Sequence, residues 1–390
     1  MRRVYMDYTA SKPVDPRVVE AMLPYMSERF GNPSSLHFFG QRAREALEES
    51  RGKVASLIGA KGEEILFTSG GTEGNNLAIK GVAFRNRKRG KHLITTTIEH
   101  MSVVNTFKHL TKFGFETTRI PVDRYGLVDV ERLEEGITKE TTLISVMYAN
   151  GEIGTIQPIK EIGKVAHEHG VYLHVDAVAA AGLVPIDVGD EQIDLLSLSS
   201  NDLYGPRGVG ALYVREGVRI EPVVHGGGQE RGLRSGTENI PGIVGMGEAA
   251  EVAGREMEVE SARLATLRDR LIDGILTKIP ESYLNGHPKK RLPDNANVRF
   301  SYIEGESLIL SLDMEGVAVS SGSACTSKTL EPSHVLLAIG LRHEEAHGSL
   351  LFTLGRGSSK EDVRYVIDVL PRIVRRLRRI SPLTPKELLR

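Results

Sequence analysis

The chain has 390 residues, and its 50 basic and 51 acidic side chains nearly cancel. This balance gives no overall field that would attract nucleic acid or an anionic membrane surface, so we expect neither as a partner. The single cysteine excludes an internal disulfide, and no apolar run is long enough to span a bilayer. Because the N-terminus also turns polar before a signal-like apolar core could form, the sequence indicates a soluble protein of a reducing, cytoplasmic interior.

The N-terminal part predicts one strand and two helices. A short strand is expected at residues 4–8, stopped by Lys12 and Pro13. Asp15 then serves as the N-cap of a helix, with Pro16 in its first turn, and this helix is expected to end near residue 31. A second helix is predicted from 41 to 58, because its apolar residues fall on one face.

Strands and helices alternate over the next part of the chain. Strands are expected at residues 65–67, 92–97, 116–120, 143–148, 171–175, 195–199 and 209–214. Helices are predicted between several of them, for example at 102–112 and 159–169. Such alternation predicts the α/β class, with a mixed, mostly parallel sheet covered by helices on both faces.

A long, charged helix predicted from about 240 to 279 connects this sheet to a smaller α+β domain. That domain has expected strands at 298–301 and 350–354, and expected helices at 306–313 and 361–377. We therefore expect a large domain over residues 16–255. The small domain is expected to combine residues 1–15 with residues 256–390 and to carry the cysteine.

Two charged segments near the C-terminus have ordinary structural interpretations. The arginines between residues 372 and 379 alternate with apolar residues at helical spacing, so we expect them on the solvated face of an amphipathic helix. His343 and His347 stand four residues apart, as in some zinc sites. We expect a surface loop there and discount a metal site.

Cys325 lies in a stretch of small and hydroxylic residues, 318–327, which lacks the apolar bulk of a core strand. Such a stretch predicts a loop with a reachable thiol. That thiol could act as a nucleophile, a sulfur carrier or a metal ligand. The alternative is a buried structural cysteine, since free cysteine is among the residue types most often buried.

Polar residues after several predicted strands suggest a cofactor site. Residues 69–72 (SGGT) lie between a strand and a helix, where free amide groups and a hydroxyl can hold a phosphate. Asp176 ends a strand, and a carboxylate there suits a protonated ring nitrogen. Ser199 follows another strand and His100 a third. The alternatives are that the glycine turn and Asp176 only cap helices, and that His100 is a structural histidine whose hydrogen bonds are satisfied.

Together these segments resemble the cysteine desulfurases of the NifS/IscS type, which are pyridoxal-phosphate (PLP) enzymes of the aspartate-aminotransferase fold, fold type I. The resemblance covers nearly the whole chain, and its strings occur in the family's order. They are residues 5–8 (YMDY), 31–35 (GNPSS), 68–73 (TSGGTE), 99–100 (EH), 205–210 (GPRGVG), 225–232 (HGGGQERG), 234–237 (RSGT), 320–325 (SSGSAC) and 354–356 (LGR).

The resemblance implies a set of cofactor contacts, with Thr237 contributed by the partner subunit of a homodimer. These contacts are Gly71, Thr72, Asn150, Asp176, Ser199, Ser200, Asn201 and Thr237. Gly71, Thr72 and Ser199, with Thr237, would hold the phosphate, and Asp176 would keep the pyridine nitrogen protonated.

Three further roles follow from the same resemblance. His100 would stack on the ring and could move protons. Arg356 would bind the substrate carboxylate through its planar, bidentate guanidinium. Cys325 would attack the sulfur of L-cysteine and form a persulfide, leaving alanine, and an IscU-type iron–sulfur scaffold protein is the expected acceptor.

The sequence departs from the family's pattern in three segments, at four positions. Where the family has His-Lys, this chain has Asn201-Asp202, so the lysine of the internal Schiff base is replaced by Asp202. An aspartate cannot form an imine. The family's glutamine three residues after the strand-end aspartate is Ala179, and its paired asparagines are Asn150-Gly151.

Two functional hypotheses follow. In the first, PLP is held noncovalently and the protein is a cysteine desulfurase with impaired activity. In the second, the protein is a non-enzymatic assembly platform, in which Cys325 presents sulfur or serves as a ligand to a [2Fe-2S] cluster shared with the scaffold. A related PLP-fold lyase or aminotransferase is disfavoured by the cysteine loop and by the missing lysine.

Overall fold

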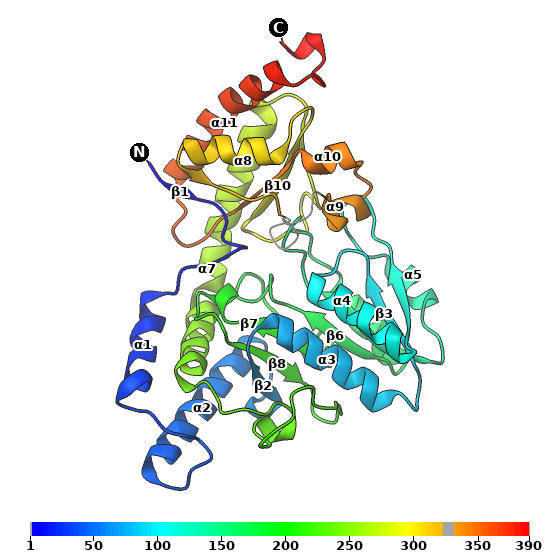
Figure 1. Ribbon diagram of the computed structural model, residues 1–390, viewed down its shortest axis with the longest axis vertical. Coiled ribbons are helices and arrows are strands. Elements are labelled where there is room, and N and C mark those ends of the chain that lie inside the picture. Colours follow the sequence, from blue (N-terminus) through cyan, green and yellow to red (C-terminus); the bar gives the residue numbers. More distant parts are fainter. Residues whose placement is uncertain (1, 323–330, 390) are drawn as a thin grey trace.

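The computed structural model describes residues 2–322 and 331–389, and its centre is a seven-stranded sheet (Figure 1). Its strands are β2 (Ile65–Thr68), β3 (His92–Thr96), β4 (Glu116–Ile120), β5 (Thr141–Met147), β6 (Tyr172–Asp176), β7 (Leu195–Ser199) and β8 (Gly210–Val214). The strand order is β2-β8-β7-β6-β5-β3-β4. Only β8 runs antiparallel to its neighbours, so the predicted mixed, mostly parallel sheet is confirmed.

Helices cover both faces of this sheet. One face packs on α3 (Gly71–Asn86) and α4 (Met101–Leu110), through a cluster that includes Leu66, Leu93 and Leu143. Side chains alternate along each strand, so the neighbours Ile65 and Ile94 belong to the cluster on the other face. That face packs on α2 (Phe38–Leu57), α6 (Ile159–Glu168) and α7 (Ile240–Lys278). Burial on both faces explains the continuously apolar strands.

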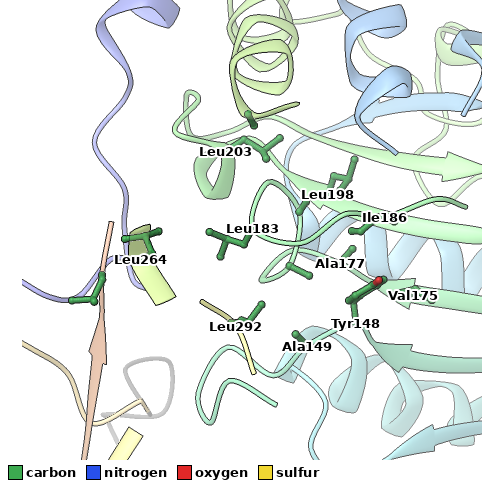
Figure 2. Close-up of a cluster of buried hydrophobic side chains, with 14 of the residues drawn as sticks. Tyr148, Ala149, Val175, Ala177, Leu183, Ile186, Leu198, Leu203, Leu264 and Leu292 are labelled. Carbon is green, nitrogen blue, oxygen red and sulfur yellow. The ribbon is translucent and has the colours of Figure 1, made fainter. Parts of the chain in front are cut away.

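Figure 2 shows part of this second cluster near the carboxyl ends of the strands. Leu198 comes from β7 and Val175 from β6, and Tyr148 directly follows β5. The same cluster continues through Leu264 of α7 and Leu292 into the C-terminal part of the chain. Packing therefore fixes the strand ends, from which the polar residues of the cavity described below extend.

The C-terminal part contains two smaller sheets. In the first, β10 (Asn295–Phe300) lies between β9 (Ser282–Leu284) and β12 (Ser349–Thr353), with both pairings antiparallel. In the second, β1 (Val4–Tyr5) pairs in parallel with β11 (Val317–Ala318). The first residues of the chain therefore pack with residues more than three hundred positions later. The predicted boundary between residues 255 and 256 lies within the continuous helix α7 (Figure 1).

The remaining helices are α1 (Pro16–Ser27), α5 (Val130–Glu135), α8 (Gly305–Met314), α9 (His334–Ala338), α10 (His343–His347) and α11 (Lys360–Ile380). Short 3₁₀ turns occur at Gly62–Glu64, Thr111–Phe113, Asn201–Leu203, Glu230–Gly232 and Lys386–Leu389. Asp15 caps α1 as predicted, accepting from the Arg17 amide. Within the residues the structure describes, no helix combines the length and apolar character needed to cross a membrane.

Two predictions for the C-terminal part were wrong. The segment around His343 and His347 is the short helix α10 rather than a loop. Arg378 is buried rather than solvated, because its guanidinium donates to the carbonyl oxygens of Pro280, Glu281 and Ser301 at 2.7–3.2 Å. Helical periodicity alone could not show that these three carbonyl groups lie within reach of α11.

A buried ion pair fixes the loop after β8 to the sheet. The Arg51 guanidinium donates to both carboxylate oxygens of Glu230, at 2.8 and 2.9 Å, and their side chains are 8% and 2% exposed. Glu230 also accepts from the amide of Phe67 at 2.9 Å. Removing one partner would leave the other charge buried and unpaired.

We therefore expect Arg51→Met to lower the free energy of unfolding by about 3–5 kcal/mol, measured by urea denaturation at fixed protein concentration. The matched control is Lys61→Met, which breaks the exposed Lys61–Glu216 pair and should change the unfolding free energy little. Equal effects of the two substitutions would contradict this assignment.

Candidate functional site

A cavity of about 390 Å³ lies beside the carboxyl ends of β6 and β7. Because these strands are parallel neighbours, their last residues lie at the same edge of the sheet. Seven of the predicted site residues line this cavity: Gly71, Thr72, His100, Asn150, Asp176, Ser199 and Asn201. The glycine turn, the strand-end aspartate and the histidine are therefore brought together, as the sequence predicted.

The first turn of α3 forms an anion-binding corner of the cavity. The amide groups of a first helical turn have no acceptor within the helix. Gly70 provides no side-chain cap and has φ +148°, a conformation that other residues rarely adopt. A Cβ on Gly71 would lie 2.4 Å from Cγ2 of Val178, so only glycine leaves this corner open. Backbone amides and positive helix-end charge at such a corner favour a phosphate.

A chain of hydrogen bonds connects Asp176 to His100. Asn75 Nδ2 donates to Asp176 Oδ2 at 2.7 Å and to Ser102 Oγ at 2.8 Å. His100 Nδ1 lies 2.7 Å from Ser102 Oγ and accepts from the Ser102 amide at 3.2 Å. Because Nδ1 is an acceptor, the neutral His100 ring carries its proton on Nε2.

Asn75 and Ser102 were not predicted from the sequence. Asn75 lies one helical turn after Gly71, so it points to the same side and lines the cavity. Ser102 lies two residues after His100 and contacts its ring nitrogen. Both are buried, at 1% and 8% exposed. They hold Asp176 and His100 in fixed orientations and leave Nε2 of His100 as the free ring nitrogen.

Asp202 lies in the 3₁₀ turn that follows β7 and lines the cavity. Burial raises the pKa of Asp202, although the nearby Lys12 ammonium and hydrogen bonds from Ser199 and Asn201 favour the ionised form. The Oδ1 atom of Asn201 is buried without a hydrogen-bond partner. This end of the cavity therefore retains unused hydrogen-bonding capacity.

The Asn150 side chain lines the cavity, but its amide atoms form hydrogen bonds within the protein. Its Nδ2 donates to the Ile98 carbonyl oxygen at 2.9 Å, and its Oδ1 accepts from the amides of Glu152 and Ile153, each at 2.9 Å. These bonds hold the turn after β5. In this conformation Asn150 shapes the wall and its polar atoms are already paired.

Three predicted residues lie outside the cavity lining. The Arg356 guanidinium is paired with the carboxylates of Asp15 and Glu256, the latter at 3.4 Å. Ser200 is completely buried, and Thr237 is exposed. Cys325, predicted as the catalytic thiol and as a metal ligand, lies outside the described residues. Within the described ranges, His, Asp and Glu side chains form no group of three or more that could hold a metal ion.

Three further carboxyl residues, Glu99, Glu152 and Asp294, line the cavity in water-poor surroundings. Burial raises the pKa of Glu99 to about 8, and the neighbouring charge of Asp176 adds to this rise. Its Oε1 accepts from Thr96 Oγ1 at 2.6 Å and from the Met147 amide at 3.1 Å, while Oε2 has no partner. Burial also raises the pKa of Asp294 to about 6.

Comparisons with known proteins agree with the fold. Residues 4–366 match the family model for aminotransferase class-V. Over 379 residues the chain is 61% identical to cysteine desulfurase IscS 1 of Archaeoglobus fulgidus, covering 97% of this chain and 99% of that protein. Over 386 residues it is 49% identical to the cysteine desulfurase of Homo sapiens, covering 98% of this chain and 84% of the human protein.

Solved structures give the same result. A NifS-like protein superposes with a TM-score of 0.90 at 38% identity, covering 96% of this chain and 99% of that one. The structure described as SspA in complex with cysteine superposes with a TM-score of 0.81 at 39% identity, covering 90% and 98%. The chain therefore belongs to the aminotransferase class-V family. Within that family it is of the NifS/IscS cysteine desulfurase type.

The raised pKa of Glu99 predicts a pH-dependent stability. Between its ordinary value of 4.5 and about 8, the folded protein holds a proton on Glu99 that the unfolded chain has released. The free energy of unfolding should therefore fall as the pH rises through this interval. We expect Glu99→Gln, which cannot ionise, to show a flatter profile in urea unfolding across the same pH range. Parallel profiles for the two proteins would contradict the assignment.

Proposed function

We propose that this protein is a cysteine desulfurase of iron–sulfur cluster assembly, which takes sulfur from L-cysteine as a persulfide on Cys325. One observation carries the proposal: the open first turn of α3, the strand-end Asp176 and His100 face a single cavity. The helix turn suits a phosphate, the aspartate suits a protonated ring nitrogen, and the histidine suits the face of an aromatic ring. The family's cofactor, PLP, presents all three.

The residues of the cavity fit PLP. The amides and hydroxyl at Gly71 and Thr72, with Ser199, would hold the phosphate. Asp176, held by Asn75, would keep the pyridine nitrogen protonated, and His100 would stack on the ring. When bound, PLP supplies an electron sink for the substrate's bonding electrons. Because Asp202 offers no amine, we propose that these noncovalent contacts retain the cofactor.

The protein's own residues would perform the remaining steps. His100 Nε2 could accept or donate a proton at the cavity. Arg356 would bind the substrate carboxylate, for which its guanidinium must exchange Asp15 and Glu256 for the substrate. The Cys325 thiolate would attack the substrate sulfur. A sulfur–sulfur bond forms as the carbon–sulfur bond breaks, and protonation of that carbon gives alanine.

Activity is proposed to be impaired by the residue at position 202. The missing lysine would normally shuttle the substrate's α-proton, and loss of such a positioned acid–base group costs about 10²–10⁴ in rate. Ala179 and Gly151 line the cavity where the family has side chains that bind cofactor and substrate. Fewer polar groups are therefore available at this side of the proposed cofactor.

We propose a homodimer, on the basis of two features. Thr237 is exposed and does not line the cavity, so we propose that its phosphate contact is made in a second copy of the chain. In addition, apolar side chains are exposed around α1 and the start of α2. These are Leu23, Met26, Phe30, Leu36, Phe38 and Phe39, at 44–84% exposed. An apolar surface of this kind commonly marks a protein interface.

An IscU-type scaffold protein is the proposed sulfur acceptor. The proposed compartment is the cytoplasm, because a reducing setting keeps the Cys325 thiol free to carry the persulfide. The alternative proposal is a non-enzymatic platform in which Cys325 is a ligand of a [2Fe-2S] cluster shared with that scaffold. A thiolate is a suitable ligand for iron–sulfur clusters. Both proposals place the functional group at the same residue.

Alanine production from L-cysteine with added PLP tests the enzymatic proposal. We expect turnover above that of free PLP with L-cysteine, loss of turnover in Cys325→Ser, and an increase of about 10²–10⁴ in Asp202→Lys. Wild-type turnover equal to that of free PLP would contradict it. The platform alternative then predicts that Cys325→Ser abolishes cluster assembly with an IscU-type scaffold supplied with iron and sulfide under anaerobic conditions.

The corner at Gly71 gives a separate test of PLP binding. We expect Gly71→Ala to raise the Kd for PLP at least about tenfold, or about 1.4 kcal/mol, because its Cβ would clash with the Val178 side chain and distort the phosphate corner. Equilibrium dialysis measures this affinity. The matched control is Gly52→Ala in α2, where a Cβ would meet no atom within 4 Å. Equal affinity in the two variants would exclude phosphate binding at α3.

A further inference from the structure

Lys12 is an amine in the cavity that the proposed function does not use. Among the described residues that line the cavity, it is the single lysine or arginine. It is 5% exposed, and its Nζ donates to the backbone carbonyl oxygen of Asp202 at 2.8 Å. A primary amine therefore lies beside the backbone of the very residue where the family resemblance leads us to expect a lysine.

The backbone of Lys12 is held from both sides. On its N-terminal side, β1 pairs with β11, and the Thr9 amide donates to Thr353 Oγ1 at 2.9 Å. On its C-terminal side, Pro13 restricts the backbone and Asp15 caps α1. The Lys12 ammonium also lies 5.2 Å from the centroid of the Tyr204 ring. The amine is thus directed into the cavity by fixed elements.

Two carboxyl groups share the surroundings of this amine. Burial raises the pKa of both Asp202 and Asp294, and the Lys12 ammonium opposes that rise in each. Both carboxyl groups therefore lie near enough to the Lys12 amine for its charge to act on them.

We propose that Lys12 supplies the amine that bonds reversibly to the aldehyde of PLP. This inference rests on the proposed function and extends it. The noncovalent contacts of the cavity bind the cofactor, and Lys12 then provides the protein amine that position 202 lacks.

The step balances without an oxidant or reductant. The Lys12 Nζ, in its neutral form, attacks the aldehyde carbon, and a carbon–nitrogen double bond replaces the carbon–oxygen double bond. The aldehyde oxygen leaves as water with the two protons of the neutral amine.

The competing interpretation is that Lys12 only compensates the charges of Asp202 and Asp294. Lys12→Arg separates the two roles, because a guanidinium keeps the positive charge and does not act as a primary amine. Asp202→Lys provides the positive control, since it places an amine at the position where the family carries one.

The experiment traps the bond in the full-length protein. Wild type, Lys12→Arg and Asp202→Lys are incubated with PLP, reduced with borohydride, digested and analysed by mass spectrometry for a pyridoxyl group on each lysine. We expect near-stoichiometric label on Lys12 in wild type and loss of that label in Lys12→Arg. In Asp202→Lys we expect label at position 202. Bound PLP is measured in parallel by equilibrium dialysis without borohydride.

Label on Lys12 no higher than on exposed lysines, in wild type that binds PLP, would overturn the inference and leave noncovalent binding standing. Absence of PLP binding in wild type would overturn the proposed function as well. Thermal unfolding of Lys12→Arg checks that the variant folds. Should it not fold, the position of the label in wild type decides the question alone.

Discussion

The hydrogen bonds of Asn75 to Asp176 and Ser102 are the contacts on which the cavity depends. They join three separate elements, α3, the end of β6 and the start of α4, at one buried side chain. Loss of either bond would leave a buried N–H of Asn75 without an acceptor, which is costly, so the three elements are held in one mutual arrangement. The positions of the phosphate corner, the ring partner and His100 relative to one another all follow from that arrangement.

Much of the fold could be predicted because its signals are local. The strands between Ile65 and Val214 are apolar runs separated by helical periodicity, and they occur within a few residues of their predicted positions. Asp176 and Ser199 could be placed at one edge because the carboxyl ends of parallel strands lie together. The predicted glycine turn likewise begins a helix, since its conformation needs only nearby residues.

The missed features depend on distant partners. Two-residue strands such as β1 and β11 carry no periodicity, so their pairing across the chain has no sequence signal. Lys12 stands alone before a proline, and nothing in its neighbours shows that it reaches Asp202. Arg356 has the expected residue type but is paired with Asp15 and Glu256, since the geometry of a long side chain is set by whichever carboxylates surround it.

The pairing of β1 with β11, together with the bridge between Asp7 and Thr353, has a consequence for biosynthesis. The segment that carries Lys12 is synthesised more than three hundred residues before the partners that hold it in place. The central sheet can form before those partners exist, but this pairing must close a loop of that length. Completion of the cavity therefore waits for synthesis of β11 and Thr353, and a cofactor that needs Lys12 can bond to it only afterwards.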